Sequence, residues 1–239
     1  MSEAADDYVY IGEELNLFAN AVNWKSYYGR HVTPYLRGDV LEVGAGLGGT
    51  SRFLCKAGLK SWTGLEPDAR LRSQLEGSLA KEPLPVPTTI IGGSTADLPP
   101  EPRYDALLYV DVIEHIEDDA GELARAAKLL RTGGVIVVLS PAHQWLYTPF
   151  DKAIGHFRRY NAARIRSICP PETRIERNRY LDSVGMLASL GNKLVLGASQ
   201  PKLNQILLWD RRMVPLSRLI DPLTCYCIGK SILGIYRKQ

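Results

Sequence analysis

The chain has 239 residues, 45% of them hydrophobic, and a formal net charge of +3 at pH 7. One domain of this length can bury a full core, and so small a charge does not indicate a polyanionic partner. The four cysteines lack the paired spacing of a zinc site, and no window offers the roughly 18 uncharged apolar residues of a membrane span. Because no N-terminal segment joins positive charge to an apolar core, we expect a cytoplasmic protein.

Short apolar runs alternate with helix-length segments along much of the chain. The predicted strands lie at about 39–43, 60–66, 87–92, 105–110 and 134–140. The predicted helices lie at about 48–58, 68–80 and 117–131, and the last one ends in a glycine pair after a basic turn. This alternation predicts an α/β fold with a parallel sheet. Two further strands are expected at 173–179 and 231–238.

A turn with almost no side chains follows the first predicted strand. Gly44 and Gly46 tolerate positive φ and carry no Cβ, so the main chain there can approach a cofactor at the carboxyl end of a buried strand. With Gly49 they also match the G-x-G-x-x-G pattern of dinucleotide-binding folds. The turn by itself therefore leaves the cofactor open.

The residues around the turn are more specific. Glu42 stands two positions before the first glycine, and Glu66-Pro67-Asp68 ends the second apolar run. From Val40 to Pro141 the chain resembles class I S-adenosylmethionine-dependent methyltransferases of the type 11/12 group, with a weaker likeness at 232–238. The resemblance implies a Rossmann-like, seven-stranded, mostly parallel sheet with an antiparallel last strand. It also implies S-adenosylmethionine as cofactor, with its methionine part at the glycine turn and both ribose hydroxyls on Glu66.

The resemblance assigns a set of cofactor-binding residues to this chain. They are Glu42, Gly44, Ala45, Gly46, Glu66, Pro67, Ser94, Thr95, Asp111 and Val112. Ser94 is a departure, because an aspartate usually binds the adenine amino group at this place in the family. A serine accepts one hydrogen bond, and Asp97 is also placed to reach the base.

Asp111 to His115 would lie at the carboxyl end of the fourth strand, beside the transferable methyl group. The unperturbed pKa of a histidine side chain suits His115 to the role of a general base, although Glu114 and His115 could equally brace the loop. The spacing also resembles the Glu-x-x-Glu-His element of ubiquinone-pathway O-methyltransferases and small-RNA 2′-O-methyltransferases, where acids and histidine hold Mg²⁺. Asp111, Glu114 and His115 would then be ligands, with His156 as a fourth. Activity that is unaffected by chelation would rule this site out.

A loop after the fifth strand resembles the D-x-x-x-G-H-x-R-R-Y element of some bacterial class I methyltransferases. Asp151, His156, Arg158, Arg159 and Tyr160 keep that pattern. His156 or Tyr160 would orient an acceptor hydroxyl while the arginines hold an anionic group. Alternatively, the arginines pair with Asp151 and nearby acids to pin the loop over the cofactor.

We expect one methyltransferase domain over 1–239, with two helical additions. The first is an N-terminal segment, 1–36, which is rich in aromatic residues that either wall an acceptor pocket or pack onto the sheet. The second is an insertion at 181–230 between strands six and seven. Within it, the apolar run 206–209 leads into Asp210, Arg211 and Arg212. This pattern suits either an ordinary cap helix or peripheral contact with an anionic membrane.

The predicted function is transfer of a methyl group from S-adenosylmethionine to a small-molecule acceptor, with oxygen favoured and an anionic or lipid-linked metabolite as candidate. The alternatives are an NAD-dependent oxidoreductase and a non-catalytic S-adenosylmethionine-binding partner protein. Seven arginines between His156 and Arg179 permit a nucleic-acid substrate. We do not expect one, because no basic motif with interleaved aromatic residues accompanies them. Acceptor identity and oligomeric state are not encoded in any motif.

Overall fold

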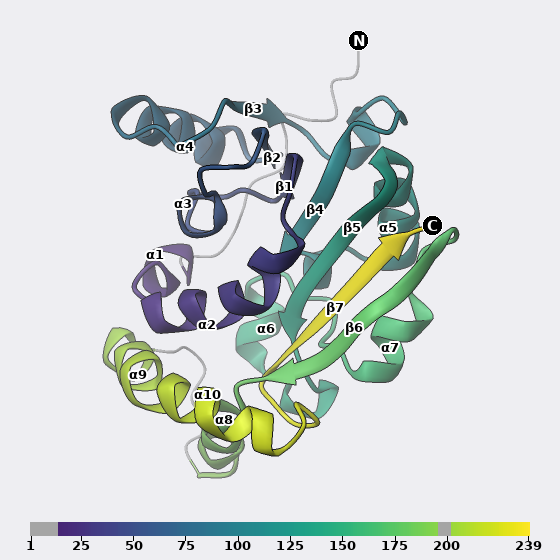
Figure 1. Ribbon diagram of the computed structural model, residues 1–239. Coiled ribbons are helices and arrows are strands. Elements are labelled where there is room, and N and C mark those ends of the chain that lie inside the picture. Colours follow the sequence, from purple (N-terminus) through teal and green to yellow (C-terminus); the bar gives the residue numbers. More distant parts are fainter. Residues whose placement is uncertain (1–13, 196–201) are drawn as a thin grey trace.

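Seven strands form one sheet in the computed structural model, which describes residues 14–195 and 202–239. The strands are β1 (Asp39–Val43), β2 (Ser61–Glu66), β3 (Thr88–Gly92), β4 (Tyr104–Val110), β5 (Leu130–Pro141), β6 (Thr173–Leu181) and β7 (Ser231–Lys238). Their order is β3-β2-β1-β4-β5-β7-β6, and β7 runs antiparallel to both of its neighbours (Figure 1). The predicted Rossmann-like class, with an antiparallel last strand, is confirmed.

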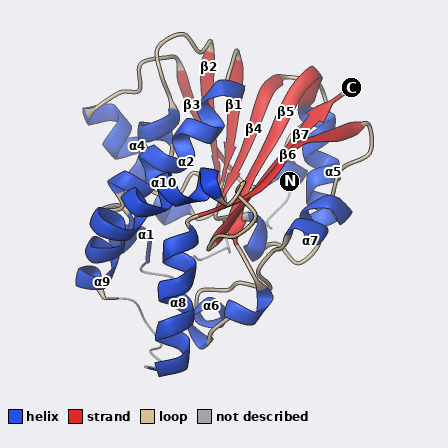
Figure 2. Cartoon of the chain, turned by 60° about the horizontal axis from the view of Figure 1, so that its bottom comes forward, coloured by secondary structure: helices blue, strands red, loops and turns tan. Residues whose placement is uncertain are grey.

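Helices cover both faces of the sheet (Figure 2). Alternate strand residues point to opposite faces, so neighbours such as Val40 and Leu41 are buried in two different apolar clusters. One cluster packs under α2 (Val22–Val32), α3 (Ser51–Leu54) and the helices that follow β6, and the other under α5 (Asp119–Leu129) and α7 (Ala162–Ser167). The remaining helices are α1 (Glu14–Phe18), α4 (Ala69–Lys81) and α6 (Pro149–Ala153), with single 3-10 turns at Thr33–Tyr35, Thr95–Asp97, Ile113–His115 and Gln144–Leu146.

Two predicted helices are shorter than expected. The helix predicted at 48–58 is only Ser51–Leu54, because residues 44–49 form the glycine turn and Cys55 has extended backbone. The helix predicted at 117–131 ends at Leu129, because Leu130 already pairs with Tyr104 in the sheet. The basic turn and glycine pair after it therefore lie at the start of β5, where Gly133 has a φ of +77°.

Helices that lie between β6 and β7 confirm the predicted helical insertion. They are α8 (Ser183–Val195), α9 (Leu203–Leu208), a π-helical turn (Trp209–Met213) and α10 (Val214–Leu223). We call these helices, residues 183–195 and 203–223, the cap. Among the described residues, no helix has both the length and the apolar character that crossing a bilayer requires.

Buried acids tie the cap to the N-terminal helix. Asp210 accepts hydrogen bonds from the backbone N–H groups of Asn23 (3.2 Å) and Trp24 (2.8 Å) at the start of α2. Asp221 accepts the Tyr27 hydroxyl (2.6 Å). Asp210 thereby satisfies donors that the N-terminus of α2 leaves free. The aromatic residues Trp24, Tyr27 and Tyr28 of α2 are buried where this helix meets the cap. Tyr8 and Tyr10 lie outside the described residues.

Candidate functional site

A cavity of about 1330 Å³ opens at the carboxyl ends of β1, β2 and β4. Parallel strands direct their carboxyl ends to one edge of the sheet, and binding sites of such folds form there. Nine of the ten predicted cofactor residues line this cavity: Gly44, Ala45, Gly46, Glu66, Pro67, Ser94, Thr95, Asp111 and Val112. The predicted catalytic residues His115 and His156 line it as well. Side chains of the cap, among them Ile206 and Trp209, form its far wall.

The glycine turn has backbone conformations that other residues rarely adopt. Gly44 has a φ of +67° and Gly46 a φ of +53°. A Cβ on Gly44 would lie 2.7 Å from Cγ2 of Val112, which follows β4. Two neighbouring strand ends therefore meet in contact at this point, and glycine is required by both space and conformation.

Glu66 holds the turn from the neighbouring strand. Its carboxylate accepts the backbone N–H of Gly46 (2.7 Å) and of Asp68 (2.9 Å). The side chain is buried, and this burial raises its pKa. Since a carboxylate has about four acceptor positions, two remain for other donors in the cavity.

Glu42 lies outside the cavity lining. It is 3% exposed and accepts hydrogen bonds from Ser51 and from Nε1 of Trp62 (3.0 Å). Burial raises its pKa to about 7. In this position the carboxyl group braces β1 against α3 and β2 beneath the glycine turn. Its cofactor-binding role stays a prediction, and no contact with the cavity supports it.

Ser94 and Thr95 begin a 3-10 turn at the cavity edge. The Ser94 hydroxyl and backbone N–H both donate to Asp97, at 2.9 and 2.7 Å, and the backbone bond lowers the pKa of that carboxyl group. Thr95 donates to the buried Glu122 (2.8 Å). Asp97 also lines the cavity, so the side chains of Ser94 and Asp97 are both placed to accept a hydrogen bond from a ligand.

The residues that follow β4 form a polar group in the cavity wall. Asp111 has a φ of +54°, which turns the chain sharply into Ile113–His115. Burial lowers the pKa of His115 to about 4, so its ring is neutral at pH 7. The rings of His115 and His156 meet edge to face, with centroids 4.5 Å apart.

Glu114 faces His156 inside the protein. One carboxylate oxygen accepts the Ser140 hydroxyl at 3.0 Å, and the other, Oε1, has no hydrogen-bond partner among the described residues. That oxygen lies 3.9 Å from Nε2 of His156. Ligand atoms of Glu114, His115 and His156 all lie within 4.8 Å of one another, whereas Asp111 is not in this group. Two imidazoles and one carboxylate suit a transition metal better than Mg²⁺, which prefers oxygen ligands.

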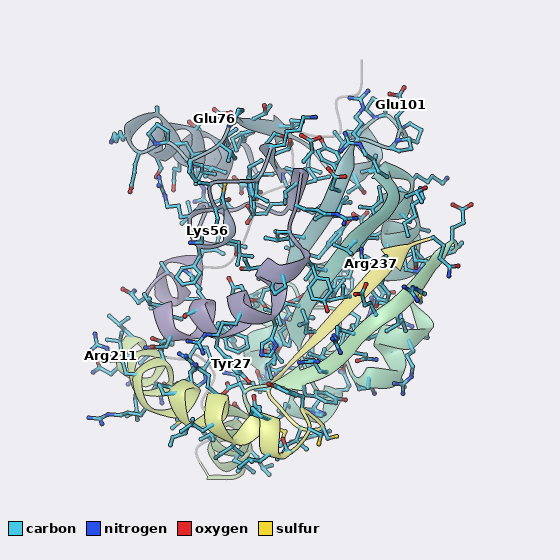
Figure 3. The ribbon with its side chains drawn as sticks, viewed as in Figure 1. Tyr27, Lys56, Glu76, Glu101, Arg211 and Arg237 are labelled. Carbon is cyan, nitrogen blue, oxygen red and sulfur yellow. The ribbon has the colours of Figure 1, made fainter. Side chains whose placement is uncertain are left out.

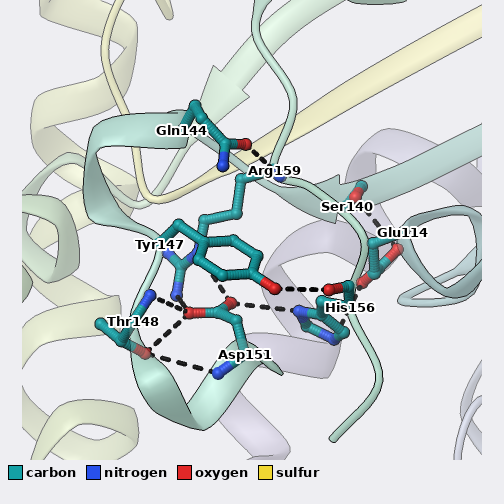
Figure 4. Close-up of polar contacts among 8 residues, drawn as sticks. All are labelled: Glu114, Ser140, Gln144, Tyr147, Thr148, Asp151, His156 and Arg159. Carbon is teal, nitrogen blue, oxygen red and sulfur yellow. Dashed lines mark hydrogen bonds and ion pairs between the residues drawn. The ribbon is translucent and has the colours of Figure 1, made fainter. Parts of the chain in front are cut away.

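The loop around α6 is held by one buried carboxylate (Figure 4). Asp151 receives two hydrogen bonds from Arg159, at 2.8 and 2.9 Å, and caps α6 through Thr148. Its Oδ1 also lies 3.1 Å from Nδ1 of His156. The Tyr147 hydroxyl donates to the carbonyl oxygen of His156 at 2.5 Å. This geometry fixes the ring orientation of His156 and supports the pinning role of Arg159.

Arg158 and Tyr160 converge on a second buried carboxylate, Asp119. Arg158 forms an ion pair with it at 3.1 Å and donates to the carbonyl oxygens of Ile116 and Glu117. The Tyr160 hydroxyl is within hydrogen-bond distance of Asp119 (2.9 Å) and of the Ile113 carbonyl oxygen (3.1 Å). Tyr160 is 0% exposed and lies outside the cavity lining. Its catalytic role stays a prediction that this position does not support.

The family model described as "Methyltransferase domain" matches residues 41–138. That segment contains β2, β3 and β4, most of β1 and β5, and the residues from Asp111 to His115 that follow β4. Residues 41–138 therefore match a methyltransferase domain, and the curated relatives of the chain are methyltransferases. The predicted resemblance to class I S-adenosylmethionine-dependent methyltransferases is therefore confirmed, and S-adenosylmethionine is the cofactor of that family.

Methyltransferases of different kinds are similar to this chain. Ajmaline N-methyltransferase of Rauvolfia serpentina is 25% identical over 76% of the chain and 58% of the relative. Demethylmenaquinone methyltransferase of Tropheryma whipplei is 31% identical over 44% of the chain and 42% of the relative. The chain thus spans about half the length of the curated relatives it matches. A solved structure of coclaurine N-methyltransferase, bound to N-methylheliamine and SAH, shares the fold at a TM-score of 0.62 and 11% identity over 91% of this chain and 72% of that one.

The sequence analysis assigned no cavity role to two residues that line the cavity, Trp209 and Lys230. Lys230 precedes β7 and places its ammonium group 4.5 Å from the ring centroid of Trp209. Among the described residues, no carboxylate forms an ion pair with it, and burial lowers its pKa. Their spacing of 21 residues gave no sign of this contact, because the two side chains meet only when α10 folds back toward the sheet.

Proposed function

We propose that this chain transfers the methyl group of S-adenosylmethionine to an oxygen atom of a small-molecule acceptor. The observation that carries the proposal is the shared cavity, in which the glycine turn and Glu66 lie at one end and His115 and Lys230 at another. A group-transfer enzyme needs both substrates in one water-poor space, with the reacting atoms aligned. The match to a methyltransferase domain and the methyltransferases among the relatives support the same reaction.

In the proposed complex, the methionine part of the cofactor lies on the glycine turn. Glu66 accepts both ribose hydroxyls with the acceptor positions left by its two backbone bonds. The adenine base lies toward Ser94 and Asp97. This arrangement directs the methyl group toward Asp111 and His115, which follow the central strand β4.

The proposed reaction is an in-line displacement at the methyl carbon. The bond from sulfur to carbon breaks, its electron pair stays on sulfur, and a bond from the acceptor oxygen to carbon forms. The acceptor proton passes to a ring nitrogen of His115, which is neutral at pH 7 because burial lowers its pKa to about 4. A weak base suffices, since the hydroxyl proton becomes strongly acidic as the oxygen is alkylated.

The walls of the cavity indicate the chemistry of the acceptor. Apolar side chains from the N-terminal helices and the cap line it, namely Leu15, Phe18, Ile206, Leu208, Trp209 and Met213. Lys230 adds a positive charge that lacks an ion-pair partner in the described part of the chain. A half-buried charge of this kind is stabilised by a ligand of opposite charge. We therefore propose an apolar acceptor that carries one anionic group.

The histidine and glutamate cluster also offers donors for a divalent ion. Glu114, His115 and His156 would hold it, and a bound ion there would polarise the acceptor oxygen. The proposed function does not depend on this ion. His115 and the cavity walls bind and orient the acceptor in either case, and the Asp151 contact keeps His156 in place.

Incubation with S-adenosylmethionine labelled in the methyl group, together with an organic extract of cellular metabolites, tests the proposal. We expect label in a product that is heavier than its precursor by one methylene group, and no label with the His115→Ala variant. Nuclear magnetic resonance of the product then locates the methyl group. A methyl group on nitrogen or carbon would contradict the oxygen assignment, and no labelled product from any fraction would contradict methyl transfer itself.

A further inference from the structure

The outer side of α10 carries a stripe of exposed apolar residues. Leu216, Leu219, Ile220 and Leu223 are 50%, 70%, 38% and 83% exposed. Their spacing of three, one and three residues places them on one face of the helix. The opposite face, with Val214, is buried against the sheet and α2. The exposed leucines thus add nothing to the core, and a contiguous apolar patch on a surface marks an interaction site.

The exposed charges beside this stripe are basic. Between Lys202 and Lys230 the chain has five basic residues but only two acids, Asp210 and Asp221. Both acids are buried, at 2% and 0% exposure, because they serve as helix caps inside the protein. Arg211 and Arg212 are exposed, and Figure 3 shows Arg211 on the outer side of the cap, away from the sheet. Within residues 202–223, the exposed surface of the cap therefore carries leucines and basic side chains but no exposed acid.

We propose that this face, made of the exposed residues of α9 to α10, docks on the surface of a membrane that contains anionic lipids. Leucines on one side of an interfacial helix enter the boundary between headgroups and acyl chains, and arginines pair with lipid phosphates. An apolar protein partner would not require the positive charge, and an acidic one would not require the leucines. A bilayer with anionic headgroups matches both, and the contact is peripheral because no described helix is able to span the bilayer.

The docking face reaches the edge of the proposed active site. Leu208 is 55% exposed and also lines the cavity, directly before Trp209. An apolar acceptor in the membrane would therefore enter the cavity beside the cap without crossing water. This consequence rests on the proposed function, whereas docking itself rests only on the surface.

Sedimentation of the full chain with lipid vesicles tests the docking. We expect binding to vesicles of phosphatidylglycerol and phosphatidylcholine, weakened by salt, and little binding to phosphatidylcholine alone. The Leu219→Ser/Leu223→Ser double variant should lower the partition coefficient by about tenfold or more, since two leucines leave the interface. Arg211→Gln/Arg212→Gln should lower it by a similar factor of roughly ten or more.

A matched control removes the same charge elsewhere. Arg166→Gln/Arg174→Gln alters exposed arginines of α7 and β6, outside the cap, and should leave vesicle binding unchanged. Equal binding to neutral vesicles, or no effect of the cap variants, would overturn the proposal. So would a dimer that the leucine variant converts to a monomer, because a second copy would then cover the face. Unchanged binding of S-adenosylhomocysteine in all variants separates a failure of docking from a failure of the proposed function.

Discussion

Nδ1 of His156 lies 3.1 Å from Oδ1 of Asp151 in the wall of the cavity. Burial alone would raise the pKa of Asp151, but hydrogen bonds from His156 and Arg159 hold it far below its usual range. The carboxylate is therefore ionised across the working pH range of most enzymes. Since one ring nitrogen of His156 is engaged in this contact, the other is directed toward Glu114. One buried acid thus sets the geometry of the loop and of the histidine pair.

Arg159 should matter to stability more than Arg158 does. Arg159→Ala leaves Asp151 without its bidentate partner, and we expect the free energy of unfolding to fall by about 3 kcal/mol. Arg158→Ala should cost about 1 kcal/mol, because Asp119 keeps Arg164 at 2.5 Å. Urea denaturation of both variants measures the difference. A raised acceptor KM for Arg159→Ala with unchanged stability would favour a role in acceptor binding over pinning.

Lys230 should govern acceptor affinity. We expect Lys230→Met to raise the acceptor KM about tenfold or more, since a charged hydrogen bond is lost, while the Kd of S-adenosylhomocysteine stays the same. Stability should fall by only about 1 kcal/mol, because the substitution removes the cation–π contact with Trp209 but no ion pair among the described residues. Lys128→Met, which removes an exposed ammonium group of α5, is the control. A KM of the variant equal to that of the unsubstituted chain would show that no anionic group of the acceptor binds to Lys230.

The raised pKa of Glu42 should make the stability of the folded chain depend on pH. Burial raises its pKa from 4.5 to about 7, so between these values the folded chain binds more protons than the unfolded chain. The contribution of Glu42 is fully present below pH 4.5 and is lost as the pH rises through 7, by at most about 3 kcal/mol. Glu42→Gln keeps the acceptor oxygen and removes the titration. Thermal denaturation should therefore show the variant gaining several degrees relative to the unsubstituted chain between pH 5 and pH 8. A difference in melting temperature between the variant and the unsubstituted chain that stays constant from pH 5 to pH 8 would contradict the raised pKa of Glu42.

The glycine turn offers a paired test in two Gly→Ala variants. Gly44→Ala places a Cβ 2.7 Å from Val112 in a backbone with a φ of +67°. We expect it to weaken S-adenosylhomocysteine binding about tenfold or more and to lower the melting temperature. Gly77→Ala lies in α4 with no atom within 4 Å of the new Cβ, so it should leave binding unchanged and stabilise slightly. Equal affinities in the two variants would contradict the role of the turn.

Much of the sheet could be predicted from the sequence, because its strands are short apolar runs bounded by glycine, proline and charge. The observed β1 and β7 start where the pattern predicts, and the two acidic strand ends, at Glu66 and Asp111, meet at one cavity. These features are local. A buried strand and the turn that follows it can be recognised from about ten consecutive residues.

Contacts between distant segments could not be predicted in the same way. Asp210 looks like part of an exposed basic run, yet its carboxylate caps α2, which lies 186 residues earlier. Tyr160 and Glu42 fit family motifs, yet both side chains turn into the core beneath the cavity. Which face of an element a side chain occupies depends on what packs against it, and the sequence alone does not contain that partner.

Calorimetric binding of S-adenosylhomocysteine and of NAD, to the unsubstituted chain and to Glu66→Ala, tests the central claim most directly. The account predicts that S-adenosylhomocysteine binds and NAD does not. It also predicts that Glu66→Ala weakens binding about a hundredfold, because two charged hydrogen bonds to the ribose are lost. Glu76→Ala, an exposed acid of α4, should bind like the unsubstituted chain. Binding of NAD alone, or an affinity for S-adenosylhomocysteine that Glu66→Ala leaves unchanged in a folded variant, would contradict the assignment of this cavity.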